Sequence, residues 1–131
     1  MEDFALRTRL SVLWIINVMS GLAFTVLGVL EPGSIDEIRS GYDHGLTIGP
    51  GLLLFYAIIF LVPLVMAFLS QTLEDKANRL ANIIVGAVYA VTTAVILILA
   101  LADRSVLAIN PASGVVFSVL TVWYAYKWSK G

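Results

Sequence analysis

The chain has 131 residues, a mean hydropathy of +0.94 and 13% charged residues, about half the fraction of ~25% found in soluble domains. Eight Lys/Arg and nine Asp/Glu residues are too few to give a soluble domain of this size its polar surface. The net charge of −1 argues against a nucleic-acid partner, and the lack of cysteine excludes disulfides, thiolate metal sites and thiol catalysis. We therefore expect a small polytopic membrane protein that forms one transmembrane domain over residues 1–131.

Four uncharged apolar runs meet or approach the ~20 residues that a membrane-spanning helix needs. They cover residues 10–30, 52–69, 80–102 and 111–126. Two starts are open for the last run. Asn110 followed by Pro111 favours a helix that begins at Pro111, which we prefer, whereas the alternative begins at Ser105 and bends at Pro111. The predicted fold is an all-α integral membrane four-helix bundle.

The placement of basic residues predicts the orientation of the four spans. One side of the membrane receives Arg7, Arg9, Lys76, Arg79, Lys127 and Lys130. The other side receives two arginines and most of the acidic residues. Because short loops rich in Lys and Arg stay in the cytoplasm, both termini are predicted to be cytoplasmic.

The two longer connections carry helix-start patterns. Ser34 and Glu37 have the spacing of a capping box, which predicts a short helix after the first span, lying on the outer membrane surface. In the connection between the second and third spans, we expect the third helix to begin near Leu73. There Asp75 is placed to pair with Arg79 four residues later.

Small residues recur at helical spacing in three of the spans. Close packing of small residues holds membrane helices together, because apolar burial gives no driving force in lipid. The candidate seams are Gly21, Thr25 and Gly28; Gly86, Ala90 and Ala94; and Gly114 and Ser118. They fit either a self-association face or packing among the four spans of one chain.

Within the four spans there is no Asp, Glu, Lys, Arg or His, so a titratable group for proton-coupled transport is lacking at membrane depth. The uncharged polar candidates are Asn17, Tyr56, Asn82, Tyr89 and Thr92. Asn17 and Asn82 lie at comparable depths and can bond to each other if their helices adjoin. Pro63 is expected to kink the second span. These residues fit either interhelical bonds or contacts to a ligand.

The outer loops hold a second group of polar candidates, namely Glu31, Asp36, Glu37, Asp43 and His44. Carboxylates beside an imidazole can bind a divalent metal or titrate near neutral pH. Their spacing matches no metal motif, so we predict a solvated loop, no metal site and no cofactor. No nucleophile–base pattern and no phosphate-binding glycine loop is present, so we predict no enzymatic activity.

Several short motifs resemble a family of short bacterial four-span membrane proteins of unknown function. The motifs are Leu13-Trp14-Ile15-Ile16-Asn17, Pro32-Gly33 with Glu37-Ile38, Ala77-Asn78-Arg79-Leu80-Ala81-Asn82-Ile83, Asn110-Pro111, and Trp123-Tyr124-Ala125-Tyr126-Lys127-Trp128. The resemblance implies a four-helix fold and a bacterial or archaeal cytoplasmic membrane, and it assigns no functional residue. Small multidrug exporters carry a carboxylate in their first span, whereas this chain has Asn17 there.

Two hypotheses for function follow from the sequence. The first is a non-enzymatic protein that acts by helix association, either as a homo-oligomer or within a larger membrane complex. The second is a transporter-like carrier of small molecules or lipids, with an interhelical cavity near Asn17, Tyr56, Pro63 and Asn82.

Overall fold

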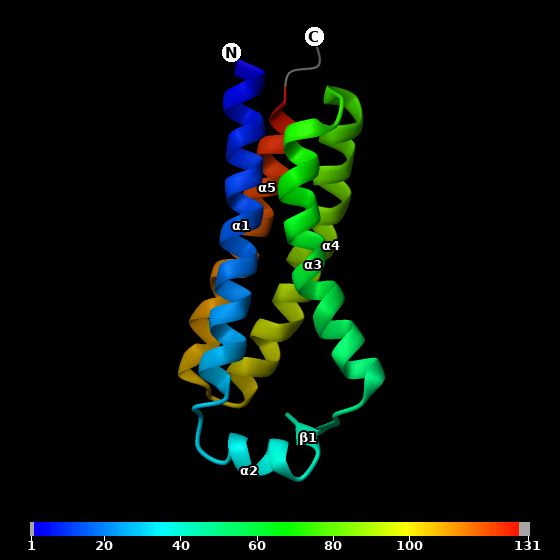
Figure 1. The fold of residues 1–131 in the computed structure, drawn as a ribbon. Helices are drawn as coiled ribbons and strands as arrows, with labels where there is room; N and C mark the ends of the chain where they lie inside the picture. The colour runs from blue at the N-terminus through cyan, green and yellow to red at the C-terminus, as the bar shows by residue number, and fades with distance from the viewer. Residues whose placement is uncertain (1, 129–131) are drawn as a thin grey trace.

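The computed structural model describes residues 2–128, and helices dominate it (Figure 1). In chain order the elements are α1 (Glu2–Gly28), α2 (Ser34–Arg39), β1 (Tyr42–Asp43), β2 (Leu46–Thr47), α3 (Pro50–Thr72), α4 (Asp75–Ala102), the 3-10 turn η1 (Val106–Ala108) and α5 (Ile109–Lys127). The predicted all-α class is confirmed, with 83% helix. Four helices (α1, α3, α4, and α5 with η1) are long and apolar enough to cross a membrane.

The four long helices form a bundle with two distinct ends. At the terminal end lie the start of α1, the end of α5 and the short link between α3 and α4 (Figure 1). At the loop end lie α2, the β1–β2 hairpin and the connection between α4 and α5 (Figure 1). Lys130, one of the residues behind the predicted orientation, lies outside the described residues.

Packing between the helices is uneven. α1 packs along both α3 and α5, and α4 packs along α5. α3 and α4 have the shortest link of any two long helices, yet they make few contacts, and they diverge toward the loop end (Figure 1). A short link therefore accompanies close packing for α4 and α5 but not for α3 and α4.

Helix boundaries depart from the predicted spans where a helix continues into polar sequence. α1 begins at Glu2 rather than at residue 10, and α4 begins at Asp75 rather than near Leu73. An apolar run marks only the part of a helix that suits lipid, whereas backbone hydrogen bonding continues into polar flanks.

The last helix begins between the two starts considered from the sequence, because α5 starts at Ile109, two residues before Pro111, and η1 precedes it. The Ser105 hydroxyl accepts a hydrogen bond from the Leu107 backbone N–H at 3.1 Å and caps η1, which runs directly into α5 at Ile109. Asn110 lies inside α5, where its side-chain amide donates to the Ser20 carbonyl at 3.3 Å instead of capping the helix. The α-helix itself thus starts near the preferred Pro111, whereas the helical segment that includes η1 starts next to Ser105, and Asn110 is not the N-cap.

The predicted short helix after the first span is present as α2, but not its capping box. Gly33, with φ 83°, occupies the N-cap and Ser34 is the first helical residue. The Glu37 carboxylate accepts a hydrogen bond from the Gly45 N–H at 2.8 Å rather than returning to the start of the helix. Gly45 and His44 have positive φ and form the two-residue turn of the β1–β2 hairpin, as in a type I′ turn.

The distribution of side chains differs from that in a soluble domain. Among the described residues, seven polar ones are buried in the bundle: Ser11, Asn17, Ser70, Asn78, Asn82, Ser118 and Thr121. Large apolar side chains are exposed around the outside of every long helix, including Ile15 and Leu22 on α1, Leu54 and Leu61 on α3, Val88 and Ile98 on α4, and Val116 and Val119 on α5. Polar residues are thus buried beside apolar ones such as Leu10, Trp14 and Met66, while the outside of the long helices is apolar.

Candidate functional site

A buried polar cluster joins three helices near the terminal end, and we call Trp14, Ser70, Asn78 and Asn82 the asparagine cluster. The indole N–H of Trp14 on α1 donates to Asn82 Oδ1 on α4 at 2.7 Å. Asn82 Nδ2 donates to Asn78 Oδ1 at 2.7 Å and to the Asn78 carbonyl at 2.9 Å, and Ser70 Oγ lies 3.2 Å from it. Asn78 Nδ2 donates to the Ser70 carbonyl on α3 at 2.8 Å, so all four residues tie α1, α3 and α4 together.

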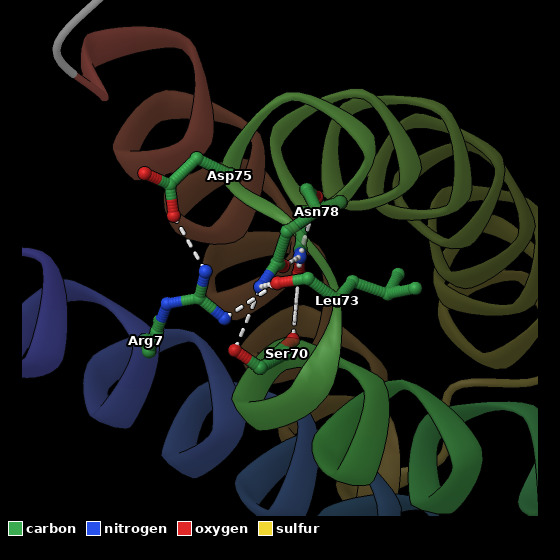
Figure 2. A network of polar contacts seen from close by, with 6 residues as sticks. Arg7, Ser70, Leu73, Asp75 and Asn78 are labelled. Atoms are coloured by element: carbon green, nitrogen blue, oxygen red, sulfur yellow. Dashed lines mark hydrogen bonds and ion pairs between the residues drawn. The ribbon is translucent and has the colours of Figure 1, made fainter.

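An ion pair covers the terminal side of the asparagine cluster. Arg7 on α1 donates to the Leu73 carbonyl at 2.6 Å and pairs with the Asp75 carboxylate at 2.5 Å (Figure 2). The predicted pair between Asp75 and Arg79 is not formed, because Asp75 faces Arg7. Arg79 instead donates to the Tyr126 carbonyl at 3.4 Å on α5.

The asparagine cluster uses its hydrogen-bonding capacity internally. An indole N–H only donates, so the atom of Asn82 that faces Trp14 must be the carbonyl oxygen, and its amide nitrogen is directed to Asn78. Buried polar groups that are all paired make a rigid connection rather than a ligand site. Sequence reasoning identified Asn82 but not its partners, although Asn78 and Asn82 have the i,i+4 spacing of one helix face.

Asn17 takes part in a separate polar contact between α1 and α5. Its amide donates to Ser118 Oγ at 3.3 Å, and one turn further the Ser20 and Ser113 hydroxyls lie 2.7 Å apart. Asn17 and Asn82 do not bond to each other: Asn17 bonds to Ser118 on α5, and Asn82 accepts from Trp14 on α1.

Tyr89 on α4 provides the hydrogen bond that Pro63 removes from α3. Proline has no N–H, so the carbonyl of the residue four positions earlier loses its helical partner. That residue is Ile59, and the Tyr89 hydroxyl donates to its carbonyl oxygen. The Tyr89 ring also meets Trp14 edge-on, with ring centroids 5.5 Å apart. Tyr89 thus connects α4 to α3 through this hydrogen bond and to α1 through Trp14.

The other two polar candidates have local partners. The Tyr56 hydroxyl donates to the Asp43 carboxylate at 2.7 Å and fastens the hairpin to α3. Thr92 Oγ1 donates to the Val88 carbonyl of its own helix at 2.8 Å. The residues that were expected to line one interhelical cavity, among them Asn17 and Tyr56, therefore make separate contacts in different parts of the bundle.

Three of the small-residue positions make close approaches within the chain. A Cβ on Gly86 would lie 2.9 Å from Val122 Cγ2 on α5, and one on Gly114 would lie 3.0 Å from Thr93 Cγ2 on α4. A Cβ on Gly21 would lie 3.1 Å from the Phe60 ring on α3, whereas one on Gly28 would meet nothing within 4 Å. The remaining positions are Thr25, which donates to its own helix, half-buried Ala90 and Ala94, and buried Ser118.

Acidic residues at the loop end fasten loops to helices. Glu31 accepts from the Ser105 hydroxyl at 2.9 Å, which joins the end of α1 to the connection between α4 and α5. Asp43 accepts from Tyr56, His44 Nε2 lies 3.6 Å from the Asp43 carboxylate, and Asp36 is exposed. Among the side chains of residues 3–128, no three His, Cys, Asp or Glu come together in a manner that would hold a metal ion.

Basic and aromatic side chains pair at the terminal end. The cationic group lies within 6 Å of the ring centre in each pair, close enough for a cation–π interaction. The pairs are Arg7 with Trp128, Arg9 with Tyr124, Arg79 with Tyr126, and Lys127 with Trp123. Aromatic rings and basic groups concentrated at one end of an apolar bundle are typical of a membrane–water interface.

The fold and its polar contacts define a small helical bundle with an apolar exterior. The chain belongs to DUF6326, a family of unknown function whose model matches residues 3–130. This confirms the resemblance to a family of unknown function over nearly the whole chain. No curated protein and no solved structure matches the chain.

Proposed function

We propose that this protein is a non-enzymatic membrane protein that crosses a bacterial or archaeal cytoplasmic membrane four times and acts by helix association. The observation that carries the membrane placement is the distribution of side chains, with buried Asn78, Asn82 and Ser118 and an apolar exterior. An exposed apolar surface on every long helix needs a lipid environment, since monomeric soluble proteins rarely expose such large patches. Paired backbone groups and internal polar bonds are what a bilayer requires of a spanning helix.

The basic residues support a cytoplasmic terminal end. Arg7, Arg9, Lys76, Arg79 and Lys127 all lie at this end, while Arg39 and Arg104 lie at the loop end. By the positive-inside rule, the start of α1 and the end of α5 then face the cytoplasm, and α2 rests on the outer surface.

α3 is the helix best suited to associate with another membrane helix. In the most apolar stretch of α3 and of α4, 11% of the residues are buried, against 28% in α1 and in α5. Leu54, Ile58, Leu61 and Val65 on α3 are exposed and follow one another at spacings of four, three and four residues, so they form one stripe. The divergence of α3 from α4 leaves this helix with its main neighbour on one side, α1. The proposed partner is a second copy of the chain or a helix of a larger membrane protein.

A photocrosslinking experiment tests this proposal in a chain that has no native cysteine. Benzophenone-maleimide is attached to Leu61→Cys on α3 or, as a matched control at mid-helix, to Val119→Cys on α5. Both positions are exposed, by 57% and 52%. The protein is irradiated in liposomes at a low protein-to-lipid ratio and in native membranes.

Each outcome of this experiment bears on the proposal. Dimers at Leu61 and not at Val119 in liposomes support self-association. An adduct of fixed mass at Leu61 in native membranes, with none in liposomes, supports a partner protein. Labelling of lipid alone at Leu61, or equal crosslinking at Leu61 and Val119, contradicts the proposed face.

The carrier hypothesis gains no observation of its own. Its four residues (Asn17, Tyr56, Pro63 and Asn82) do not line one cavity: Asn17 bonds to α5, Tyr56 bonds to the hairpin, and Asn82 is fully paired in the asparagine cluster. Helix association is therefore the function that the geometry supports best.

A further inference from the structure

Two adjoining hollows lie between α1 and α5 at the terminal end, away from the α3 stripe. The hollow farther from the two termini, which we call the deeper hollow, has a volume of 310 Å³, and the hollow nearer the termini, which we call the outer hollow, has a volume of 210 Å³. Arg9 of α1 and Tyr124 of α5 line both hollows, so the two adjoin, and together we call them the α1–α5 groove.

The lining of the α1–α5 groove changes from apolar to charged along its length. The deeper hollow is lined by Val12, Leu13 and Leu120, together with Thr8. The outer hollow is lined by Asp3, Leu6, Lys127 and Trp128. On α1 the change takes place within one helical turn, because Val12 and Leu13 follow Arg9 by three and four residues.

The cations of the groove have aromatic neighbours but no ion-pair partner among the side chains of residues 3–128. Arg9 lies 5.7 Å from the centre of the Tyr124 ring and Lys127 lies 5.5 Å from that of Trp123. The described side chains form one ion pair, between Arg7 and Asp75, and His44 lies 3.6 Å from Asp43, so neither contact involves a groove cation. Among the described lining residues of the outer hollow, Asp3 supplies one negative charge against the positive charges of Arg9 and Lys127, so this lining has a net positive charge.

We propose that the α1–α5 groove binds one anionic phospholipid. Its phosphate group faces Arg9 and Lys127 in the outer hollow, and the first part of an acyl chain lies against Val12, Leu13 and Leu120 in the deeper one. The single negative charge of a phosphodiester complements the net positive charge of the lining, and the apolar half distinguishes a lipid from a free anion. The inference rests on the proposed membrane placement and is independent of association through α3.

Lipid binding is measured as quenching of tryptophan fluorescence by brominated lipids added to the full-length protein in detergent. Brominated phosphatidylglycerol is compared with brominated phosphatidylcholine. We expect the native protein to prefer phosphatidylglycerol and Arg9→Gln with Lys127→Gln to lose that preference by about tenfold or more, since each basic residue near an anionic headgroup adds to its attraction. Arg9→Lys restores the charge and should keep most of the preference.

Two controls separate the groove from general electrostatics and from binding of free phosphate. Lys76→Gln removes an exposed charge at the same end but outside the groove, and it should leave the preference unchanged. Val12→Phe narrows the deeper hollow without adding a tryptophan to the readout and should weaken phosphatidylglycerol binding, with helix content checked by circular dichroism. An equal loss in Lys76→Gln, no loss in the Arg9 and Lys127 variant, or displacement of the lipid by glycerol 3-phosphate at similar concentrations would overturn the proposal. These outcomes leave the α3 crosslinking result unaffected, so the two ideas fail separately.

Discussion

At the scale of single residues, the bundle is specified by polar side chains that complete one another across helices. Pro63 leaves the Ile59 carbonyl without its helical donor, and Tyr89 supplies a hydroxyl from the neighbouring helix. In lipid no water is present to take over this role, so the freed carbonyl must find a protein donor.

The pairing of Tyr89 with Pro63 predicts a conditional effect on stability. Tyr89→Phe should lower the free energy of unfolding by about 1 kcal/mol, because it leaves the Ile59 carbonyl unpaired while keeping the ring against Trp14. In a Pro63→Ala background the helix regains its own N–H donor, so the same substitution should cost much less. The measurement is a double-mutant cycle of unfolding in mixed micelles, and equal costs in both backgrounds would refute the assignment.

Asn17 and Asn82 looked equivalent in the sequence, and the structure distinguishes them. Asn82→Ala should destabilise the protein by about 2–3 kcal/mol, because the Trp14 N–H and the Asn78 side chain lose a buried partner. Asn17→Ala removes one longer bond to Ser118 and should cost about 1 kcal/mol or less. Unfolding followed by circular dichroism measures both, and a ranking with Asn17 as the costlier loss would contradict the network described here.

At the scale of helices, close packing between α4 and α5 relies on glycine. Gly86 approaches Val122 so closely that a Cβ there would force Val122 to shift, and a Cβ on Gly114 would be tight against Thr93. Small residues at such positions let membrane helices come near enough for dispersion forces to act along their length.

This packing predicts opposite outcomes for two glycine substitutions. Gly86→Ala should lower the free energy of unfolding by about 1–3 kcal/mol, since Val122 has to move. Gly28→Ala meets open space and should be neutral or slightly stabilising, because alanine favours a helix over glycine by up to about 1 kcal/mol. Thermal unfolding of the two variants in the same detergent is the test, and equal losses would show that the α4–α5 approach is not the cause.

The positions of the helices could largely be predicted from the sequence. The four apolar runs located every long helix, and the pattern at Ser34 located α2, because lipid-compatible composition and turn residues are local signals. The sequence did not reveal that α3 and α4 diverge or that Trp14 meets Tyr89, because both depend on packing between segments that are distant in the chain. It also did not reveal that Asp75 pairs with Arg7 rather than Arg79, because the choice depends on a distant segment.

At the scale of the whole molecule, the two ends of the bundle differ in chemistry. The terminal end gathers the basic and aromatic side chains, and the loop end gathers acidic residues that bind loops to helices. The sequence pattern was sufficient for this asymmetry, because it depends on the order of charges along the chain. The sequence pattern was not sufficient to place individual candidate residues, because the partners of Asn17, Tyr56 and Tyr89 lie in other elements of the structure.

Cysteine accessibility tests the four proposed crossings of the membrane and the cytoplasmic placement of the terminal end. Single cysteines replace the exposed residues Asp3, Lys76 and Lys127 at the terminal end and Arg39 and Asp103 at the loop end, in a chain with no cysteine of its own. A membrane-impermeant maleimide is applied to intact spheroplasts. We expect labelling at Arg39→Cys and Asp103→Cys from outside, and at Asp3→Cys, Lys76→Cys and Lys127→Cys only after permeabilisation. Labelling of all five positions without permeabilisation, or the reverse pattern, would contradict the proposed topology.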